Sequence, residues 1–152
     1  MKQVILNDIR SNYNVGAIFR TCDGAGVSKV YLAGVTPAPQ DRFGRKVAEI
    51  SKTALGAEDF IPWEKVDDIL ILIKRLQSEG VKVVAVELYA DAVSLHDFEL
   101  PDSVAYILGS ETDGLSEEIL EIVDQVLEIP MHGKKESLNV SVSAGIVLYH
   151  AG

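Results

Sequence analysis

Short apolar runs alternate along the chain with longer segments in which apolar residues recur at helical spacing. The runs at residues 81–88 and 103–109 are almost continuously apolar, which is typical of strands buried on both faces of a parallel sheet. The runs that predict strands occupy residues 4–7, 29–34, 81–88, 103–109 and 125–130, with a brief extended piece at 59–63.

The segments between these runs predict helices, and several begin at a residue that suits a helix N-cap. Ser116 precedes an acidic first turn, and acidic side chains are favourable near a helix N-terminus. Asn14 is the candidate cap of the first helix and Ser137 that of the last. The predicted helices span residues 15–26, 64–80, 116–125 and 137–152, and a shorter helix follows the Pro/Gly-containing basic loop at 36–46.

This alternation of strands and helices predicts one α/β domain over residues 1–152, with a mostly parallel sheet and helices on both faces. In such sheets, ligands bind at the carboxyl ends of the strands. Polar segments that contain glycine follow the strands at 4–7, 103–109 and 125–130. We therefore expect these segments to form one site.

The composition agrees with a globular domain and excludes several other classes. Hydrophobic residues make up 47% and charged residues 24% of the 152 residues. No apolar run approaches the roughly 20 residues of a membrane-spanning helix, and the first residues lack the apolar stretch of a secretory signal. Cys22 is the only cysteine, which excludes an intramolecular disulfide and predicts a cytoplasmic protein with this residue packed in the core.

The net charge of −9 argues against a simple nucleic-acid binder, which usually presents a basic surface. The charge is unevenly distributed, however. Residues 1–56 hold eight of the 14 Lys and Arg residues but four of the 23 Asp and Glu residues. The first part of the chain is therefore net positive, and we expect one face that tolerates nucleic acid and one that repels it.

The segments at the strand ends carry the candidate chemistry. At 12–26, Gly16 allows a close backbone approach and Arg20 lies on the same helix face, with a planar set of donors suited to phosphate. A capped helix with a surface arginine fits this segment equally well. At 108–116, Glu111 stands at the crest of a loop between two glycines, without the pattern of a P-loop or a dinucleotide fingerprint.

The third segment, 129–149, joins a polar turn to an apolar helix. Lys134 and Lys135 lie in the turn, and Ser137, Asn139 and Ser141 follow at the predicted start of the helix. The histidines of the chain and Cys22 do not have the spacing of metal ligands, so we predict no metal site.

These segments share a particular order and spacing. N-x-G-x-x-x-R at 14–20, L-G-x-E-x-x-G-L at 108–115, and I-P-M at 129–131 with S-L-N-V-S-V-x-x-G-I-V-L-Y at 137–149 resemble the three motifs of the SpoU (TrmH-like) branch of SPOUT RNA methyltransferases. The stretch KTALGAED at 52–59 is also similar to that family. The resemblance covers about residues 3–149.

The resemblance implies a fold and a cofactor. The family fold is an α/β sheet whose C-terminal segment forms a trefoil knot that binds S-adenosylmethionine in a bent form, and pattern arguments cannot predict a knot. Family members are homodimers that methylate ribose 2′-hydroxyls of tRNA or rRNA, with the arginine that corresponds to Arg20 reaching the site from the partner. By position, the cofactor residues are Val86, Glu87, Leu108, Gly109, Ile129, Met131, Ser137 and Leu138.

The resemblance also implies catalytic residues, which by position are Asn14, Arg20, Glu111, Ser137 and Asn139. Arginine is a poor base because its pKa exceeds about 12, so we favour a role for Arg20 in holding the RNA phosphate and the ribose hydroxyl. With no room for an additional RNA-binding domain, RNA binding falls to the dimer, with or without an accessory protein, and should weaken with added salt. The candidate RNA-binding residues are Arg10, Arg20, Arg42, Arg45, Lys46, Lys134 and Lys135.

Two alternatives belong to other functional classes. One is a non-catalytic RNA-binding or ribosome-associated protein that keeps the fold without turnover. The other is an unrelated α/β nucleotide-binding or signalling domain, which predicts neither cofactor binding nor a knot. Within the methyltransferase hypothesis tRNA and rRNA both remain open as substrates, although single-domain relatives include tRNA wobble-position enzymes and favour tRNA slightly.

Overall fold

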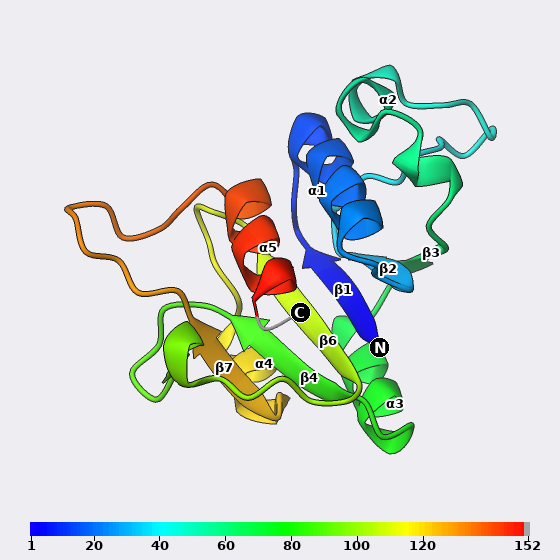
Figure 1. The fold of residues 1–152 in the computed structure, drawn as a ribbon. Coiled ribbons are helices and arrows are strands. Elements are labelled where there is room, and N and C mark those ends of the chain that lie inside the picture. Colours follow the sequence, from blue (N-terminus) through cyan, green and yellow to red (C-terminus); the bar gives the residue numbers. More distant parts are fainter. Residues whose placement is uncertain (151–152) are drawn as a thin grey trace.

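A computed structural model describes residues 1–150 and places all of its strands in one seven-stranded sheet (Figure 1). The order is β3-β2-β1-β6-β4-β7-β5, and each neighbouring pair of strands is parallel. The strands are β1 (Lys2–Asn7), β2 (Lys29–Ala33), β3 (Trp63–Val66), β4 (Lys82–Val86), β5 (Val93–Ser94), β6 (Val104–Gly109) and β7 (Gln125–Glu128).

Helices cover both faces of this sheet, as the sequence predicted. One core lies between the sheet and α1, α2 and α5, and the other lies between the sheet and α3 and α4. The helices are α1 (Asn12–Gly24), α2 (Ala48–Ala54), α3 (Ile69–Ser78), α4 (Glu117–Ile122) and α5 (Val140–Tyr149), with short 3₁₀ turns η1 (Ala57–Asp59) and η2 (Leu95–Asp97).

The central strands are apolar on both faces because each face is covered. In β1, Val4 and Leu6 belong to the core under α1, whereas Ile5 between them belongs to the core under α3. In β6, Tyr106 likewise belongs to the core under α1, and Ile107 belongs to the core under α3. Side chains alternate between the faces of a strand, so a continuous apolar run fits a buried parallel strand and not a half-exposed one.

Two of the three predicted N-caps are wrong. Ser11, and not Asn14, caps α1, because the Ser11 Oγ accepts a hydrogen bond of 3.2 Å from the Asn14 amide. Asn139, and not Ser137, caps α5, because its side chain accepts from the Ser141 amide at 2.9 Å. Asn14 therefore lies in the first turn of α1 with its carboxamide available for other contacts. The third predicted cap, Ser116, is confirmed at the start of α4.

The helix predicted at 64–80 is wrong over its first residues. Trp63–Val66 instead form β3, which pairs with β2 at the edge of the sheet. Helix α3 begins only at Ile69, where Asp68 caps it by accepting from the Leu70 amide at 2.9 Å. Periodicity does not distinguish a short strand from the start of a helix, so pairing with β2 decides the structure here.

The last predicted helix reached residue 152, and residues 151–152 lie outside the described part of the chain. Among residues 1–150, no helix combines the length and apolar character needed to cross a membrane. The threading of the chain through a knot, which the resemblance implies, stays a prediction.

Candidate functional site

A cavity of about 420 Å³ opens at the carboxyl ends of β4, β6 and β7. Its walls come from the segments at 86–89, 108–115 and 129–138 and from the start of α5. The segments that follow β6 and β7 therefore lie side by side around this cavity, as the sequence predicted. All of the predicted cofactor residues line this cavity, namely Val86, Glu87, Leu108, Gly109, Ile129, Met131, Ser137 and Leu138.

The loop between β6 and α4 forms one wall as a tight turn. The Gly114 amide donates to the Ser110 carbonyl at 2.9 Å, and these two residues form an isolated antiparallel bridge. Gly114 has a φ of +64°, which glycine adopts without the strain of other residues. Glu111 consequently stands at the crest of the turn, as the sequence predicted.

Glu87, at the end of β4, holds this loop against the neighbouring strand. Its Oε2 accepts from the Leu115 amide at 2.9 Å, and its Oε1 accepts from the Leu88 amide at 3.1 Å. A Cβ atom on Gly114 would lie only 2.6 Å from Glu87 Oε2, so the close approach requires glycine. The resemblance implied Glu87 as a cofactor residue but did not predict this function of its side chain.

We expect Glu87→Gln to weaken binding of S-adenosylhomocysteine by about 5- to 30-fold, because losing a charged acceptor for a backbone amide costs roughly 1–2 kcal/mol and loosens the cavity wall. Isothermal titration measures this affinity. Glu118→Gln is the matched control, since Glu118 is exposed in the first turn of α4 and does not line the cavity. Equal affinities of the two variants would show that the loop does not need Glu87.

A hydrogen-bonded cluster joins three of the predicted catalytic residues at the edge of the cavity. Asn14 Nδ2 donates to Glu111 Oε1 at 3.4 Å, and Asn139 Nδ2 donates to Asn14 Oδ1 at 3.4 Å. Glu111 Oε1 also accepts from the Val140 amide at 3.3 Å. These long hydrogen bonds connect α1, the β6–α4 loop and the start of α5. We refer to Asn14, Glu111 and Asn139 as the polar cluster.

The remaining predicted catalytic residues, Ser137 and Arg20, differ in their position relative to the cavity. Ser137 lines the cavity, but Arg20 does not. Arg20 lies on α1 six residues beyond Asn14, about 9 Å along the helix axis, and is exposed. It borders a separate shallow depression whose other lining residues are Ala17, Thr21, Gly24, Lys52, Thr53, Leu55 and Tyr149.

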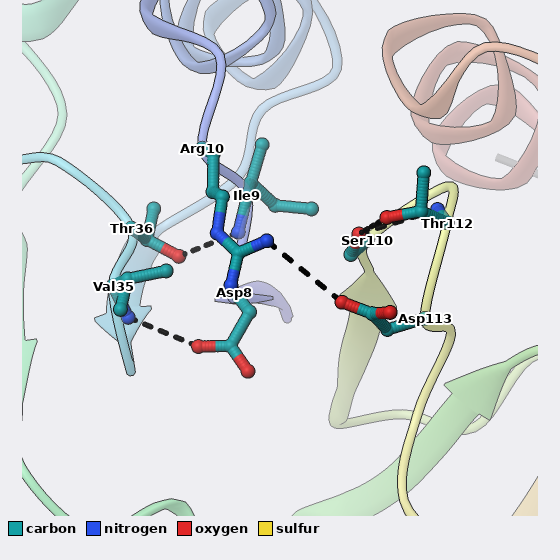
Figure 2. A network of polar contacts seen from close by, with 8 residues as sticks. All are labelled: Asp8, Ile9, Arg10, Val35, Thr36, Ser110, Thr112 and Asp113. Atoms are coloured by element: carbon teal, nitrogen blue, oxygen red, sulfur yellow. Dashed lines mark hydrogen bonds and ion pairs between the residues drawn. The ribbon is translucent and has the colours of Figure 1, made fainter.

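The predicted RNA-binding residues are distributed over several surfaces. Arg10 forms an ion pair of 3.8 Å with Asp113, which lines the cavity (Figure 2). In the same view Asp8 and Thr36 fix the adjoining β1–α1 and β2–α2 connections, through hydrogen bonds from the amides of Val35 at 3.0 Å and Ile9 at 3.1 Å. Arg42, Arg45 and Lys46 lie in the β2–α2 connection, and Lys134 and Lys135 are exposed between β7 and α5.

The single cysteine has the structural role that the sequence predicted. Cys22 lies on the buried face of α1, and burial raises the pKa of its thiol to about 12. At neutral pH the thiol therefore stays protonated and is a poor nucleophile. Among the described residues, no group of three or more His, Cys, Asp or Glu side chains is arranged to hold a metal ion.

The whole cavity and the polar cluster lie within a region that matches known proteins. The chain is 36% identical over 145 residues to 23S rRNA (guanosine-2′-O-)-methyltransferase RlmB from Neisseria meningitidis, covering 95% of this chain and 55% of that protein. It is 32% identical over 148 residues to tRNA (guanosine(18)-2′-O)-methyltransferase from Aquifex aeolicus, covering 97% and 67%. The chain thus spans little more than half the length of the RlmB relative.

Solved structures share the same fold. The TrmH/SpoU tRNA modifying enzyme of A. aeolicus superposes with a TM-score of 0.85 at 31% identity, over 99% of this chain and 73% of that one. An AdoMet-bound rRNA methyltransferase from Sinorhizobium meliloti gives 0.84 at 30% identity, over 99% and 55%. The model of the SpoU rRNA Methylase family matches residues 1–149. This chain therefore belongs to the SpoU rRNA methylase family.

Proposed function

We propose that this protein transfers a methyl group from S-adenosylmethionine to a ribose 2′-hydroxyl of tRNA or rRNA. The observation that carries the proposal is the cavity at the ends of β4, β6 and β7, which gathers every residue predicted for the cofactor. The relatives, which include both 23S rRNA and tRNA 2′-O-methyltransferases, and the AdoMet-bound structure of one such enzyme support it.

The charge of the cavity fits this cofactor. Its volume is within the usual range for small-molecule sites, about 300–1,000 Å³. No Lys or Arg is among its lining residues, whereas the carboxylates of Glu87, Glu111, Asp113, Glu117 and Glu136 are. Such a lining attracts a cationic ligand and disfavours the phosphates of a nucleotide. This argues for S-adenosylmethionine over the alternative of an α/β nucleotide-binding domain.

When bound, S-adenosylmethionine supplies a methyl group on an electrophilic sulfonium. The loop residues Leu108, Gly109, Ile129 and Leu138 would hold it and exclude water, and the acidic lining would stabilise its positive charge. The polar cluster would orient the ribose so that its oxygen attacks the methyl carbon in line with the departing sulfur, which would leave S-adenosylhomocysteine. The hydroxyl proton would pass to the neighbouring RNA phosphate held by Arg20 and from there to water. Positioning of this kind contributes much of the rate in a displacement reaction.

We propose that the enzyme works as a homodimer in which Arg20 serves the partner's cavity. Arg20 is exposed and away from the cavity of its own chain. Exposed apolar residues Val142, Ile146 and Tyr149 follow one face of α5, next to α1, as expected for a surface that another subunit covers. Cytoplasmic location and an accessory RNA-binding protein stay predictions.

Isothermal titration with S-adenosylhomocysteine tests the cofactor site, and we expect saturable binding near one molecule per subunit. Transfer of labelled methyl from S-adenosylmethionine to unfractionated tRNA and rRNA tests the reaction, with 2′-O-methylnucleosides identified by mass spectrometry. Binding without transfer to either RNA would favour the non-catalytic RNA-binding alternative. An absence of binding would contradict the proposed cofactor.

A further inference from the structure

An exposed aromatic residue in the connection from β2 to α2 has two guanidinium groups close to its ring. Phe43 is 66% exposed, and the guanidinium carbons of Arg42 and Arg45 lie 4.8 Å and 5.0 Å from its ring centroid. The proposed methyl-transfer site does not use this residue, since Phe43 lines neither the cavity nor the depression beside Arg20. Core packing does not explain it either, because most of the side chain is in contact with solvent.

Local hydrogen bonds give this connection a defined shape. Gln40 and Lys46 form an antiparallel bridge, and the Asp41 amide donates to the Arg45 carbonyl at 2.9 Å. Asp41 Oδ1 accepts from the Phe43 amide at 2.8 Å and from the Arg45 amide at 3.0 Å. We refer to residues 40–46 as the Phe43 hairpin.

Asp41 keeps its charge in this arrangement. Hydrogen bonds from the Arg45 amide, the Phe43 amide and the Arg45 guanidinium hold the pKa of the Asp41 carboxyl below its ordinary value. Gly44 closes the turn with a φ of +77°, and its amide donates to the Asp41 carbonyl at 3.0 Å. The hairpin thus presents Phe43 in a preformed position, which lowers the conformational entropy lost when a ligand binds.

We propose that the Phe43 hairpin binds an unpaired segment of the RNA substrate, with a nucleobase stacked on the Phe43 ring and a neighbouring phosphate held by Arg42. This inference rests on the proposed function and adds to it a substrate feature, an unpaired segment that contacts the protein outside the cavity. Stacking on aromatic side chains is the usual way in which proteins hold unpaired bases, and guanidinium groups suit both stacking and phosphate binding.

The charges around Phe43 favour RNA over a protein partner. Arg42 and Arg45 lie beside the ring and Lys46 belongs to the same hairpin, in a chain whose net charge is −9. Arg45 is paired with Asp41 at 2.8 Å and Lys46 with Asp59 at 2.9 Å. Within residues 1–150, Arg42 has no carboxylate at ion-pair distance, so its charge is available for phosphate.

Phe43→Leu tests the inference, because it keeps an apolar side chain but removes the aromatic face. The probes are a fluorescently labelled RNA stem–loop with unpaired loop nucleotides and the same stem closed as a blunt duplex, measured by anisotropy at low and high salt. We expect Phe43→Leu to weaken stem–loop binding by about 5- to 100-fold, the range measured for loss of one stacked base. Duplex binding should change less than twofold, and Phe43→Trp should restore stem–loop binding.

Phe60→Leu is the matched control, since Phe60 is 75% exposed and no guanidinium lies over its ring. It should bind the stem–loop as the unmodified protein does, and S-adenosylhomocysteine affinity should be the same for all variants. Unchanged stem–loop affinity in Phe43→Leu, or an equal loss in Phe60→Leu, would overturn the inference even if methyl transfer is observed. A protein that binds the stem–loop through Phe43 but transfers no methyl group would overturn the proposed function and leave this inference standing.

Discussion

Arg20→Ala is expected to lower methyl transfer to RNA by about 10³-fold while leaving the affinity for S-adenosylhomocysteine unchanged. The reason is that Arg20 does not line the cavity in which the cofactor would bind, whereas the proposed reaction needs its guanidinium at the ribose and phosphate. Arg20→Lys should recover little of the rate, because an ammonium group lacks the planar pair of donors. Single-turnover methylation and isothermal titration measure the two quantities.

The matched control for this substitution is Lys52→Ala. Lys52 borders the same shallow depression as Arg20 and carries the same charge, so it reports any general electrostatic loss of RNA binding. We expect Lys52→Ala to raise the RNA concentration needed for half-maximal rate without removing turnover. Equal rate losses in the two variants, or a loss of cofactor affinity in Arg20→Ala, would contradict a specific role for Arg20.

A mixed dimer tests whether Arg20 acts across the subunit interface. In a dimer of one Arg20→Ala subunit and one Glu111→Ala subunit, one cavity has an intact polar cluster and also receives Arg20 from its partner. Such heterodimers, isolated with two affinity tags, should methylate RNA although both parental homodimers are inactive. An inactive heterodimer would place Arg20 in the cavity of its own chain.

The sequence predicted the layers of the fold because burial on both faces leaves a direct signal. The runs at 81–88 and 103–109 correspond to β4 and β6 at the centre of the sheet, where helices cover both sides. Residues 64–66 of the edge strand β3 were predicted as helix, because so short a stretch of half-exposed and exposed residues carries no comparable signal. The strand order is also not encoded locally, since it depends on which strands pair across long stretches of chain.

The residues of the site depended on resemblance, because the contacts that build it are distant in sequence. Glu111 and Asn14 are 97 residues apart and Asn139 and Asn14 are 125 apart, so no spacing rule predicts the polar cluster. Glu87 and Leu115, which are hydrogen-bonded, are also distant in sequence, 28 residues apart. In contrast, the sequence alone suggested that Gly16 marks a close backbone approach, and the structure shows where that approach occurs.

Gly16 lies where α1 crosses α2, and replacing it with alanine should destabilise the protein. An added Cβ would lie 2.0 Å from Thr53 Oγ1 and 2.3 Å from the Ile50 carbonyl oxygen. Thr53 is itself fixed, because its hydroxyl donates to the Tyr13 carbonyl at 2.9 Å. A backbone oxygen cannot turn away as a flexible side chain can, so α2 as a whole must shift.

We expect Gly16→Ala to lower the free energy of unfolding by about 1–2 kcal/mol, since a close backbone clash puts the overpacking cost in the upper part of the roughly 1–3 kcal/mol range and the better helix propensity of alanine offsets about 1 kcal/mol. Urea unfolding followed by circular dichroism measures this change. Gly145→Ala is the matched control within α5, because the nearest atom to its added Cβ is Thr21 Cγ2 at 3.9 Å, an ordinary contact. That variant should be as stable as the unmodified protein or more so.

The same shift of α2 should also move the surroundings of Arg20, the proposed catalytic arginine. Thr53, whose hydroxyl meets the added Cβ, lines the depression that also holds Arg20 and Leu55. Folded Gly16→Ala should therefore methylate RNA more slowly, yet bind S-adenosylhomocysteine normally, because α2 contributes nothing to the cavity. If the variant kept both its full methylation rate and its free energy of unfolding, α2 would shift without an energetic penalty. Gly16 would then be needed neither for packing nor for the placement of Arg20.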